Sequence, residues 1–362
     1  MKEDDIIADW AERIRSASAH EQPLCIRGGG TKDWYGQTPE GEMFDTRAYR
    51  GVIAYDPAEL VITARAGTPL AEIEATLAGH GQMLAFEPPH FGAQATFGGC
   101  IAAGLAGPRR PFAGAVRDFI LGATLMNGRG EVLRFGGQVV KNVAGYDVSR
   151  LVAGSLGTLG LILELSVRVM PLPQAETTLQ FSMNESDAIR RLNEWGSKPL
   201  PVTASAWRDG TLMLRLSGAQ AGVQAACASL GGGAVDAAEA GRFWAGLREQ
   251  TDSFFTPIAP DAALWRLALP PTTEPLPLCG TQLVEWNGGQ RWWVTAADAQ
   301  TLRASVQQSG GHATLFRAGA DYARGAGVFT LLPEPLMKIH RGLKAVFDPA
   351  GIFNRGRLYP DF

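Results

Sequence analysis

Residues 23–32, PLCIRGGGTK, pass from a short apolar segment directly into three consecutive glycines. The run 23–27 is predicted to be a strand, so the glycines at 28–30 follow it as a loop. Consecutive glycines let backbone N–H groups point toward one centre and hold an anion such as a pyrophosphate. An ordinary flexible turn would use the same glycines, so other parts of the sequence must decide between the two interpretations.

A second glycine cluster lies in residues 96–104, TFGGCIAAG. Residues 96–106 are predicted to form a helix of almost only small residues that begins with Gly98-Gly99. Such a helix would present free N–H groups at its positive end and let a flat cofactor lie close to its surface. The alternative is a small-residue helix that packs tightly against its neighbours.

A third set of glycines, at positions 154, 157 and 160, turns the chain into residues 161–169, where apolar and polar residues alternate. The alternation predicts a half-buried strand with all its odd-numbered residues on one face. The three clusters do not contain GxGxxG after the first strand, because Asp33 stands where the third glycine would be, and GxxxxGK[ST] is absent. These absences disfavour NAD binding and a P-loop.

Hydrophobic periodicity and turn residues predict the other elements of the first part of the chain. These are a helix over 4–17, strands over 51–55 and 60–66, a helix capped by Thr68, strands over 119–126 and 131–135 joined by Asn127-Gly128, and a helix over 336–346. The run Met170-Pro171-Leu172-Pro173 marks a boundary. We therefore expect an α+β protein with a first domain over 1–173, a second α+β domain over 174–330, and a separate C-terminal segment over 331–362.

Composition excludes several classes of protein. The 362 residues include 33 Lys and Arg against 36 Asp and Glu, without a basic block, which disfavours nucleic-acid binding. The four cysteines are far apart and offer no metal or iron–sulfur ligand set. We find no signal peptide and no apolar run that could insert into a membrane, so we expect a cytoplasmic protein. Any association with the inner membrane would be made through partner subunits.

The order of the three clusters, with KNVAGYD at 141–147 between the second and third, resembles the FAD-binding domain of the vanillyl-alcohol-oxidase / p-cresol-methylhydroxylase (PCMH) type over residues 23–172. Residues 87–162, from EPPHFG to GTLGLI, are similar to the E-subunit family of bacterial glycolate oxidase (glycolate dehydrogenase). The tail at 337–358, MKIHRGLKAVFDPAGIFNRGRL, resembles the closing segment of that family, which implies that residues 331–362 pack back on the first domain. The middle of the chain, 175–330, resembles it only weakly.

The resemblance implies a set of FAD-binding residues. The first loop would cradle the pyrophosphate, Arg117-Asp118 would open a strand beside the cofactor, the backbone of Ile162 would meet the adenine or flavin edge, and Asn354 would close over the isoalloxazine. The full set is Arg27, Gly28, Gly29, Gly30, Thr31, Pro88, Thr96, Gly98, Gly99, Gly104, Arg117, Asp118, Gly154, Gly157, Gly160, Ile162 and Asn354. Some relatives bond the flavin to a histidine in the first loop, and this loop has none, so FAD is expected to be noncovalent.

Oxidation of a 2-hydroxy acid needs a proton acceptor, a cation for the carboxylate and a flavin that accepts the hydride. The catalytic sister subunit of the family carries HxGDGNxH, which the five widely spaced histidines of this chain cannot form. His340 is the best candidate for the proton acceptor and His90 the second, although a merely solvent-facing helix histidine explains His340 as well. The candidates for holding the carboxylate are Arg109, Arg110, Arg317 and Arg324. Of these candidates we carry forward His340 and Arg324.

The resemblance further implies a homologous catalytic flavin subunit and an iron–sulfur subunit as partners, with glycolate or D-lactate as substrate. The tryptophans at 286, 292 and 293 could dock a partner or pack the core of their own domain. Two other hypotheses stay open. The chain could be a self-sufficient flavin oxidoreductase acting on another alcohol, or it could be a scaffold that holds flavin without a redox role.

Overall fold

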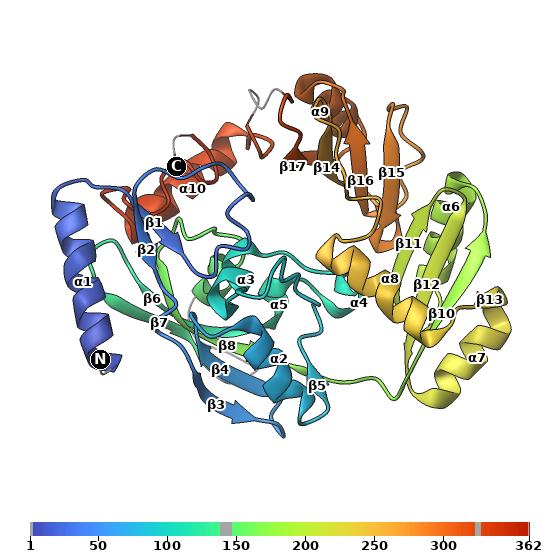
Figure 1. The fold of residues 1–362 in the computed structure, drawn as a ribbon, viewed down its shortest axis with the longest axis horizontal. Helices are drawn as coiled ribbons and strands as arrows, with labels where there is room; N and C mark the ends of the chain where they lie inside the picture. The colour runs from blue at the N-terminus through green and yellow to red at the C-terminus, as the bar shows by residue number, and fades with distance from the viewer. Residues whose placement is uncertain (1–2, 138–146, 323–326, 361) are drawn as a thin grey trace.

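In the computed structural model, which describes residues 3–137, 147–322, 327–360 and 362, the chain builds two larger sheets with no strand in common. Figure 1 shows the smaller of these sheets beneath α2 and α3 and the larger one on the opposite side of the molecule. The mixture of helices with antiparallel sheets confirms the predicted α+β class. None of the described helices has the combined length and apolarity that crossing a membrane requires.

The first part of the chain centres on a five-stranded antiparallel sheet in the order β3-β4-β8-β6-β7. Its strands are β3 (Val52–Asp56), β4 (Val61–Arg65), β6 (Ile120–Met126), β7 (Val132–Gly136) and β8 (Leu161–Arg168). Two small sheets accompany it: β1 (Leu24–Arg27) runs parallel to β2 (Glu42–Asp45), and β5 (Gln82–Met83) pairs with β9 (Met170–Pro171). The helical segments are α1 (Glu3–Ala19), α2 (Leu70–Ala78), α3 (Phe97–Ala103), α4 (Arg110–Ala113), α5 (Val116–Phe119) and the 3₁₀ turn η1 (Val148–Val152).

The sheet is covered on both faces, so one part of the prediction for residues 161–169 is wrong. The strand β8 lies at the centre of the sheet, and its pairing with β6 shifts register between Thr124 and Leu125. Leu161 and Leu163 consequently join a core cluster with α1, whereas the later odd-numbered residues of the strand join the cluster beneath α2 and α3. A local bulge moves side chains to the other face, and alternation alone cannot reveal it.

Two other local predictions can be compared with the structure. The hairpin at Asn127-Gly128 is confirmed, with Met126 opposite Val132. The predicted cap of α2 is wrong, because Pro69 occupies the cap position and makes no side-chain cap bond. The hydroxyl of Thr68 instead accepts the amide N–H of Gly51 at 2.8 Å and donates to the carbonyl of Arg65 at 2.7 Å. This threonine therefore joins two loops.

The second part of the chain forms an eight-stranded sheet in the order β13-β10-β12-β11-β15-β16-β14-β17. Its strands are β10 (Ala175–Ser182), β11 (Val202–Arg208), β12 (Thr211–Gly218), β13 (Gly233–Ala234), β14 (Ala263–Ala268), β15 (Thr281–Glu285), β16 (Gln290–Thr295) and β17 (His312–Ala318). The helical segments are α6 (Glu185–Gly196), α7 (Gln220–Leu230), α8 (Ala237–Glu249), α9 (Ala299–Gln308) and the 3₁₀ turn η2 (Trp286–Gly288). We propose domain boundaries at 173/174 and 330/331, since β10 starts a separate sheet at Ala175.

A buried ion network joins the two parts. Glu87, which precedes the prolines at 88 and 89, contacts Arg215 of β12 at 2.8 Å and Arg109 at 3.3 Å. Arg109 also reaches Glu176 of β10 at 2.9 Å. The two guanidinium groups hold the pKa of Glu87 below its usual value although burial opposes this. Around this network Tyr35 and Leu105 of the first part share an apolar cluster with Trp292 and Phe316 of the second.

The C-terminal segment is tied to the first part by a buried lysine. Helix α10 (Glu334–Phe347) carries Lys344, whose ammonium group donates to Asp348 at 2.7 Å and to the carbonyls of Thr158 and Phe353, each at 2.8 Å. The carboxylate of Asp348 in turn accepts the amide N–H groups of Ile352 and Phe353. These bonds explain physically why the tail reads DPAGIFN, because the aspartate both closes the turn and neutralises the lysine.

Replacing this lysine should loosen the tail. Lys344→Met leaves the fully buried Asp348 carboxylate without its counter-charge, so we expect the free energy of unfolding to fall by about 3–5 kcal/mol. Lys338→Met, an exposed position on the same helix, should change it by less than about 0.5 kcal/mol. Urea denaturation followed by tryptophan fluorescence measures both variants. Equal stability of the two would contradict the assigned role of Lys344.

A buried glutamate makes stability depend on pH. Glu285, at the end of β15, accepts hydrogen bonds from Trp292 and Gln290, and burial raises its pKa to about 7. Because the folded pKa exceeds the unfolded one, the stabilisation is present in acid and is lost as pH rises through 7. The unfolding free energy should thus fall by roughly 2–3 kcal/mol more in the parent protein than in Glu285→Gln between about pH 5 and about pH 8. Urea denaturation at a series of pH values measures the free energy of unfolding of both proteins. The same change with pH in the parent and in Glu285→Gln would disprove this prediction.

Candidate functional site

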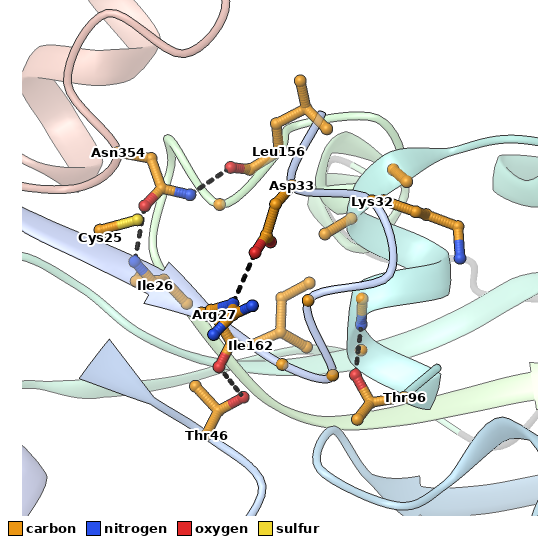
Figure 2. A pocket seen from close by; sticks show the side chains of 18 of the residues that line it. Cys25, Ile26, Arg27, Lys32, Asp33, Thr46, Thr96, Leu156, Ile162 and Asn354 are labelled. Carbon is orange, nitrogen blue, oxygen red and sulfur yellow. Dashed lines mark hydrogen bonds and ion pairs between the residues drawn. The ribbon is translucent and has the colours of Figure 1, made fainter. Parts of the chain in front are cut away.

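A cavity of about 300 Å³ lies where the three glycine clusters and the C-terminal tail meet. Its walls come from residues 25–33, from positions 96–103 around α3, and from 156–162 at the start of β8, with Asn354 and Arg357 of the tail. Figure 2 shows Ile26 and Arg27 at the end of β1, opposite Thr96 at the start of α3. Segments far apart in the sequence therefore share one cleft.

The first loop supplies unpaired backbone donors to this cleft. Within the described part of the chain, the amide N–H groups of residues 28–31 have no hydrogen-bond acceptor. Gly30 has φ +73°, which favours glycine, and the loop turns back so that Asp33 N–H reaches the Gly30 carbonyl. Four adjacent free donors at one wall of a cavity form a place for an anion.

The first and second clusters touch each other at their glycines. A Cβ atom on Gly28 would lie 2.3 Å from the Thr96 hydroxyl, and one on Gly29 would lie 1.5 Å from the carbonyl oxygen of Gln94. A Cβ atom on Gly98 would likewise lie 2.5 Å from the Cβ of Ala66. The glycine loop and the start of α3 can therefore approach their neighbours this closely only because these positions have no side chains.

The expectation that Gly98 and Gly99 offer free N–H groups is wrong. Gly98 N–H donates to the carbonyl of Ala66 at 2.8 Å, and Gly99 N–H donates to the Thr96 hydroxyl at 3.2 Å, which is the cap of α3. The helix also ends at Ala103, with Gly104 in the left-handed conformation as its C-cap. The second cluster consequently provides a smooth wall, and the anion donors come from the first loop.

The third cluster meets the tail. A Cβ atom on Gly157, whose φ is +75°, would lie 2.6 Å from the side-chain nitrogen of Asn354. That side chain donates to the carbonyl of Leu156 at 2.5 Å and accepts the amide N–H of Ile26 at 2.6 Å, as Figure 2 shows. Both ends of the Asn354 amide are thus occupied by backbone groups, and the residue joins the cavity walls. Ile162 presents its buried side chain to the same cavity.

Charged side chains around the cleft carry excess positive charge. Arg27 pairs with Asp33 at 2.6 Å, which leaves Lys32 and Arg357 without a carboxylate partner within the described residues. Arg357 donates to the carbonyl of Lys32 at 3.0 Å, and burial lowers the pKa of both side chains. Three cations against one carboxylate favour a ligand with phosphate groups.

Not every predicted residue lines the cavity. Its walls include Arg27, the four residues 28–31, Thr96, Gly98, Gly99, Gly157, Gly160, Ile162 and Asn354. Pro88 is buried near the ion network, while Gly104 and Gly154 pack against each other, since a Cβ on Gly104 would meet the Gly154 backbone at 2.8 Å. Cofactor contact by each predicted residue stays a prediction.

The prediction that Arg117-Asp118 opens a strand is wrong. Both residues belong to the short helix α5, where the Asp118 carboxylate accepts the amide N–H of Ala115 at 2.8 Å. Arg117 is largely exposed, and β6 begins only at Ile120. An aspartate three residues after a turn caps the helix more readily than it starts a strand.

The structure also identifies wall residues that the sequence did not suggest. Lys32 and Asp33 directly follow the glycine loop, and Arg357 follows Asn354 by three residues. Their positions in the sequence, next to the predicted glycine loop and next to Asn354, could have indicated that they line the cavity. Cys25 also lines the cavity, and burial raises the pKa of its thiol.

The candidate catalytic residues lie apart from this cavity or outside the described residues. His340 packs its ring near Tyr359 and Phe362, at centroid distances of 6.5 and 6.1 Å, and does not line the cavity. His90 bonds to Glu74 at 2.9 Å. Arg324 lies outside the described residues, as does most of the segment 141–147. The catalytic roles of His340 and Arg324 stay predictions.

Comparison with known proteins connects this geometry to a cofactor. Residues 6–136 match the family described as FAD binding domain. The chain is 44% identical over 361 residues to "Glycolate oxidase subunit GlcE" of Escherichia coli (strain K12), covering 100% of this chain and 99% of the relative. It is 29% identical over 203 residues to "Glycolate oxidase subunit GlcD" of Bacillus subtilis (strain 168), covering 54% of this chain and 43% of that protein.

Two further matches extend the comparison. The "D-lactate dehydrogenase" of Archaeoglobus fulgidus is 32% identical over 193 residues, which are 52% of this chain and 43% of that protein. A solved structure of alkyldihydroxyacetonephosphate synthase superposes with TM-score 0.65 at 15% identity, covering 95% of this chain and 74% of its own, and this shows the fold alone.

The fold, the shared cleft and these matches define an FAD-binding flavoprotein of the oxidoreductase class. The residues around the cleft suit FAD, because free amides, cations and glycine-lined walls complement a diphosphate joined to flat rings. Within this class the chain belongs to the family of the glycolate oxidase subunit GlcE.

A charge at the anion loop should reduce FAD retention. Gly30→Asp adds a carboxylate to the cluster of free amides and a Cβ atom that would lie 2.3 Å from the Arg27 guanidinium. We expect FAD affinity to fall by roughly tenfold or more, measured as visible flavin absorbance per protein after gel filtration. Gly81→Asp is the matched control, because Gly81 has φ +65°, is exposed and has nothing within 4 Å of its Cβ position. Equal flavin contents in the two variants would count against the assigned phosphate loop.

Proposed function

We propose that this chain is the FAD-binding subunit of a heteromeric 2-hydroxy-acid dehydrogenase that oxidises glycolate or D-lactate. In this proposal electrons pass through the flavin to an iron–sulfur partner, beside a homologous flavin subunit. The observation that carries the proposal is the meeting of the amide-rich loop 28–31 and the glycine wall at 98–99 in one cavity. The 44% identity to a whole protein named a glycolate oxidase subunit supports the substrate class and the subunit role.

The chain's own residues suggest how the cofactor would be held. The free N–H groups of residues 28–31 would bind the pyrophosphate, and the side chains of Lys32 and Arg357 would balance its charge. Gly98, Gly157 and Ile162 would form walls that exclude water from the flat rings. When bound, FAD supplies the acceptor for the hydride that leaves the hydroxyl-bearing carbon of the substrate.

Noncovalent attachment agrees with the thiols near the cleft. Burial raises the pKa of Cys25 and raises that of Cys100 to about 12, so both thiols stay protonated and weakly nucleophilic at neutral pH. The loop 28–31 contains no histidine. These side chains give no activated nucleophile for a bond to the flavin.

A subunit needs a surface for its partners, and the tryptophans at 292 and 293 do not provide it. Both are buried, with Trp292 among the core residues between the two parts of the chain, so their proposed docking role is wrong. Large apolar side chains are exposed instead along the C-terminal segment, with Leu331, Ile339 and Val346 at 68%, 58% and 66% exposure. We propose that the homologous flavin subunit covers this stripe.

Anaerobic reduction separates a helper subunit from an independent enzyme. The purified chain should carry FAD, and glycolate added without oxygen should bleach it only when the partner subunits are present. Spectra in the visible range, recorded for the chain alone and for the co-purified complex, give the answer. Rapid bleaching of the chain alone would favour a self-sufficient oxidoreductase, and a chain that takes up no FAD would remove both redox hypotheses.

A further inference from the structure

Several buried or half-buried arginines in the described chain face a carboxylate. Examples are the pairs Arg109–Glu87, Arg215–Glu87, Arg208–Asp252 and Arg291–Glu185. Arg317 of β17 differs, because within the described residues its guanidinium has neither a carboxylate partner nor a hydrogen-bond acceptor. Burial lowers its pKa to about 10, so it still carries its charge at neutral pH.

The surroundings of Arg317 are aromatic and hollow. The guanidinium lies 4.4 Å from the ring centroid of Trp34, 5.4 Å from that of Phe91 and 5.6 Å from that of Phe316. A cavity of about 180 Å³ lies against it, lined also by Leu315, Ala318 and Val328. Aromatic faces attract the cation and leave its N–H fork available for a ligand in the cavity.

Two more cations gather around the same aromatic rings. Arg266 donates to the Tyr35 hydroxyl at 3.2 Å and lies 5.7 Å from the Phe316 centroid. Lys32 donates to a backbone carbonyl and lies 5.5 Å from the Phe91 centroid. Neither of them forms an ion pair with a carboxylate in the described part of the protein. The Glu249 carboxylate accepts the amide N–H groups of His90 and Phe91 and pairs with Arg248. The three cations around the rings therefore still leave excess positive charge under partial desolvation, which favours an anionic ligand.

We infer that the cavity at Arg317 is a site for a small organic acid, whose carboxylate the Arg317 guanidinium holds beneath the rings of Trp34 and Phe316. The size of the cavity suits a two- or three-carbon acid, and its apolar remainder accepts the carbon skeleton. Trp34 directly follows Asp33 of the larger cavity, so the acid would lie next to the cofactor cleft. The inference rests on the proposed function and adds that this chain itself binds the acid.

Calorimetry on the FAD-loaded chain, with oxygen removed, tests this inference. Glycolate is the probe, glycolamide is its neutral analogue, and inorganic phosphate represents a simple anion. Arg317→Gln should weaken glycolate binding by about tenfold or more, because it removes the charged fork, and should change glycolamide binding little. The glycolate affinity of Arg317→Lys should lie between that of the parent protein and that of Arg317→Gln. Arg13→Gln is the matched control, since Arg13 also lies 4.4 Å over an aromatic ring, that of Phe44, but on the far helix α1.

The outcomes are distinct. Unchanged glycolate affinity in Arg317→Gln, with normal flavin content, would overturn the inference while leaving the proposed function intact. Phosphate binding as tight as glycolate would overturn the assignment to an organic acid. If Arg317→Gln folds poorly, Arg317→Lys and Trp34→Phe are measured in its place. An unchanged glycolate affinity in both of these variants would equally overturn the inference. Parent protein without flavin would instead indicate failure of the proposed function.

Discussion

The cofactor cleft depends on the hydrogen bonds that the side-chain amide of Asn354 makes with two backbone groups. Its oxygen accepts the N–H of Ile26, its nitrogen donates to the carbonyl of Leu156, and its own backbone N–H donates to the carbonyl of Leu24. One buried residue thereby fixes β1, which aims the glycine loop, against the turn that enters β8. Only a side chain with a donor and an acceptor on one rigid plane can satisfy both backbone groups, and leaving either unpaired in the interior is costly.

The remaining tail supports this amide. Asn354 has φ +42°, a conformation that asparagine tolerates better than most residues, and it lies just beyond the turn closed by Asp348. The ammonium group of Lys344 neutralises that carboxylate and also bonds the carbonyl before Asn354. The position of Asn354 in the cleft therefore depends on a lysine and an aspartate that do not line it.

The sequence predicted those features that follow from local patterns. Glycines after a strand led to the anion loop, and the alternation at 161–169 led to a strand. The return of the tail to the first domain was implied by the family resemblance of its closing motif. It did not reveal the bulge in β8, because the partner strand sets the register. Nor did it reveal that Ala66 and Thr96 take the amides of the second cluster, since long-range contacts decide which donors stay free. The tryptophans were ambiguous for a similar reason, because burial depends on the neighbouring strands.

The large sequence separation between the residues that form the two walls of the cleft affects when the cofactor can bind. Ile26 and Asn354 are 328 residues apart, yet both belong to the wall of one cleft. A nascent chain emerging from the ribosome can form β1 and its glycine loop early, but the opposite wall is missing until residue 354 has been synthesised. Capture of the flavin must consequently wait for the translation of residue 354, so products that end before it would be left without their cofactor.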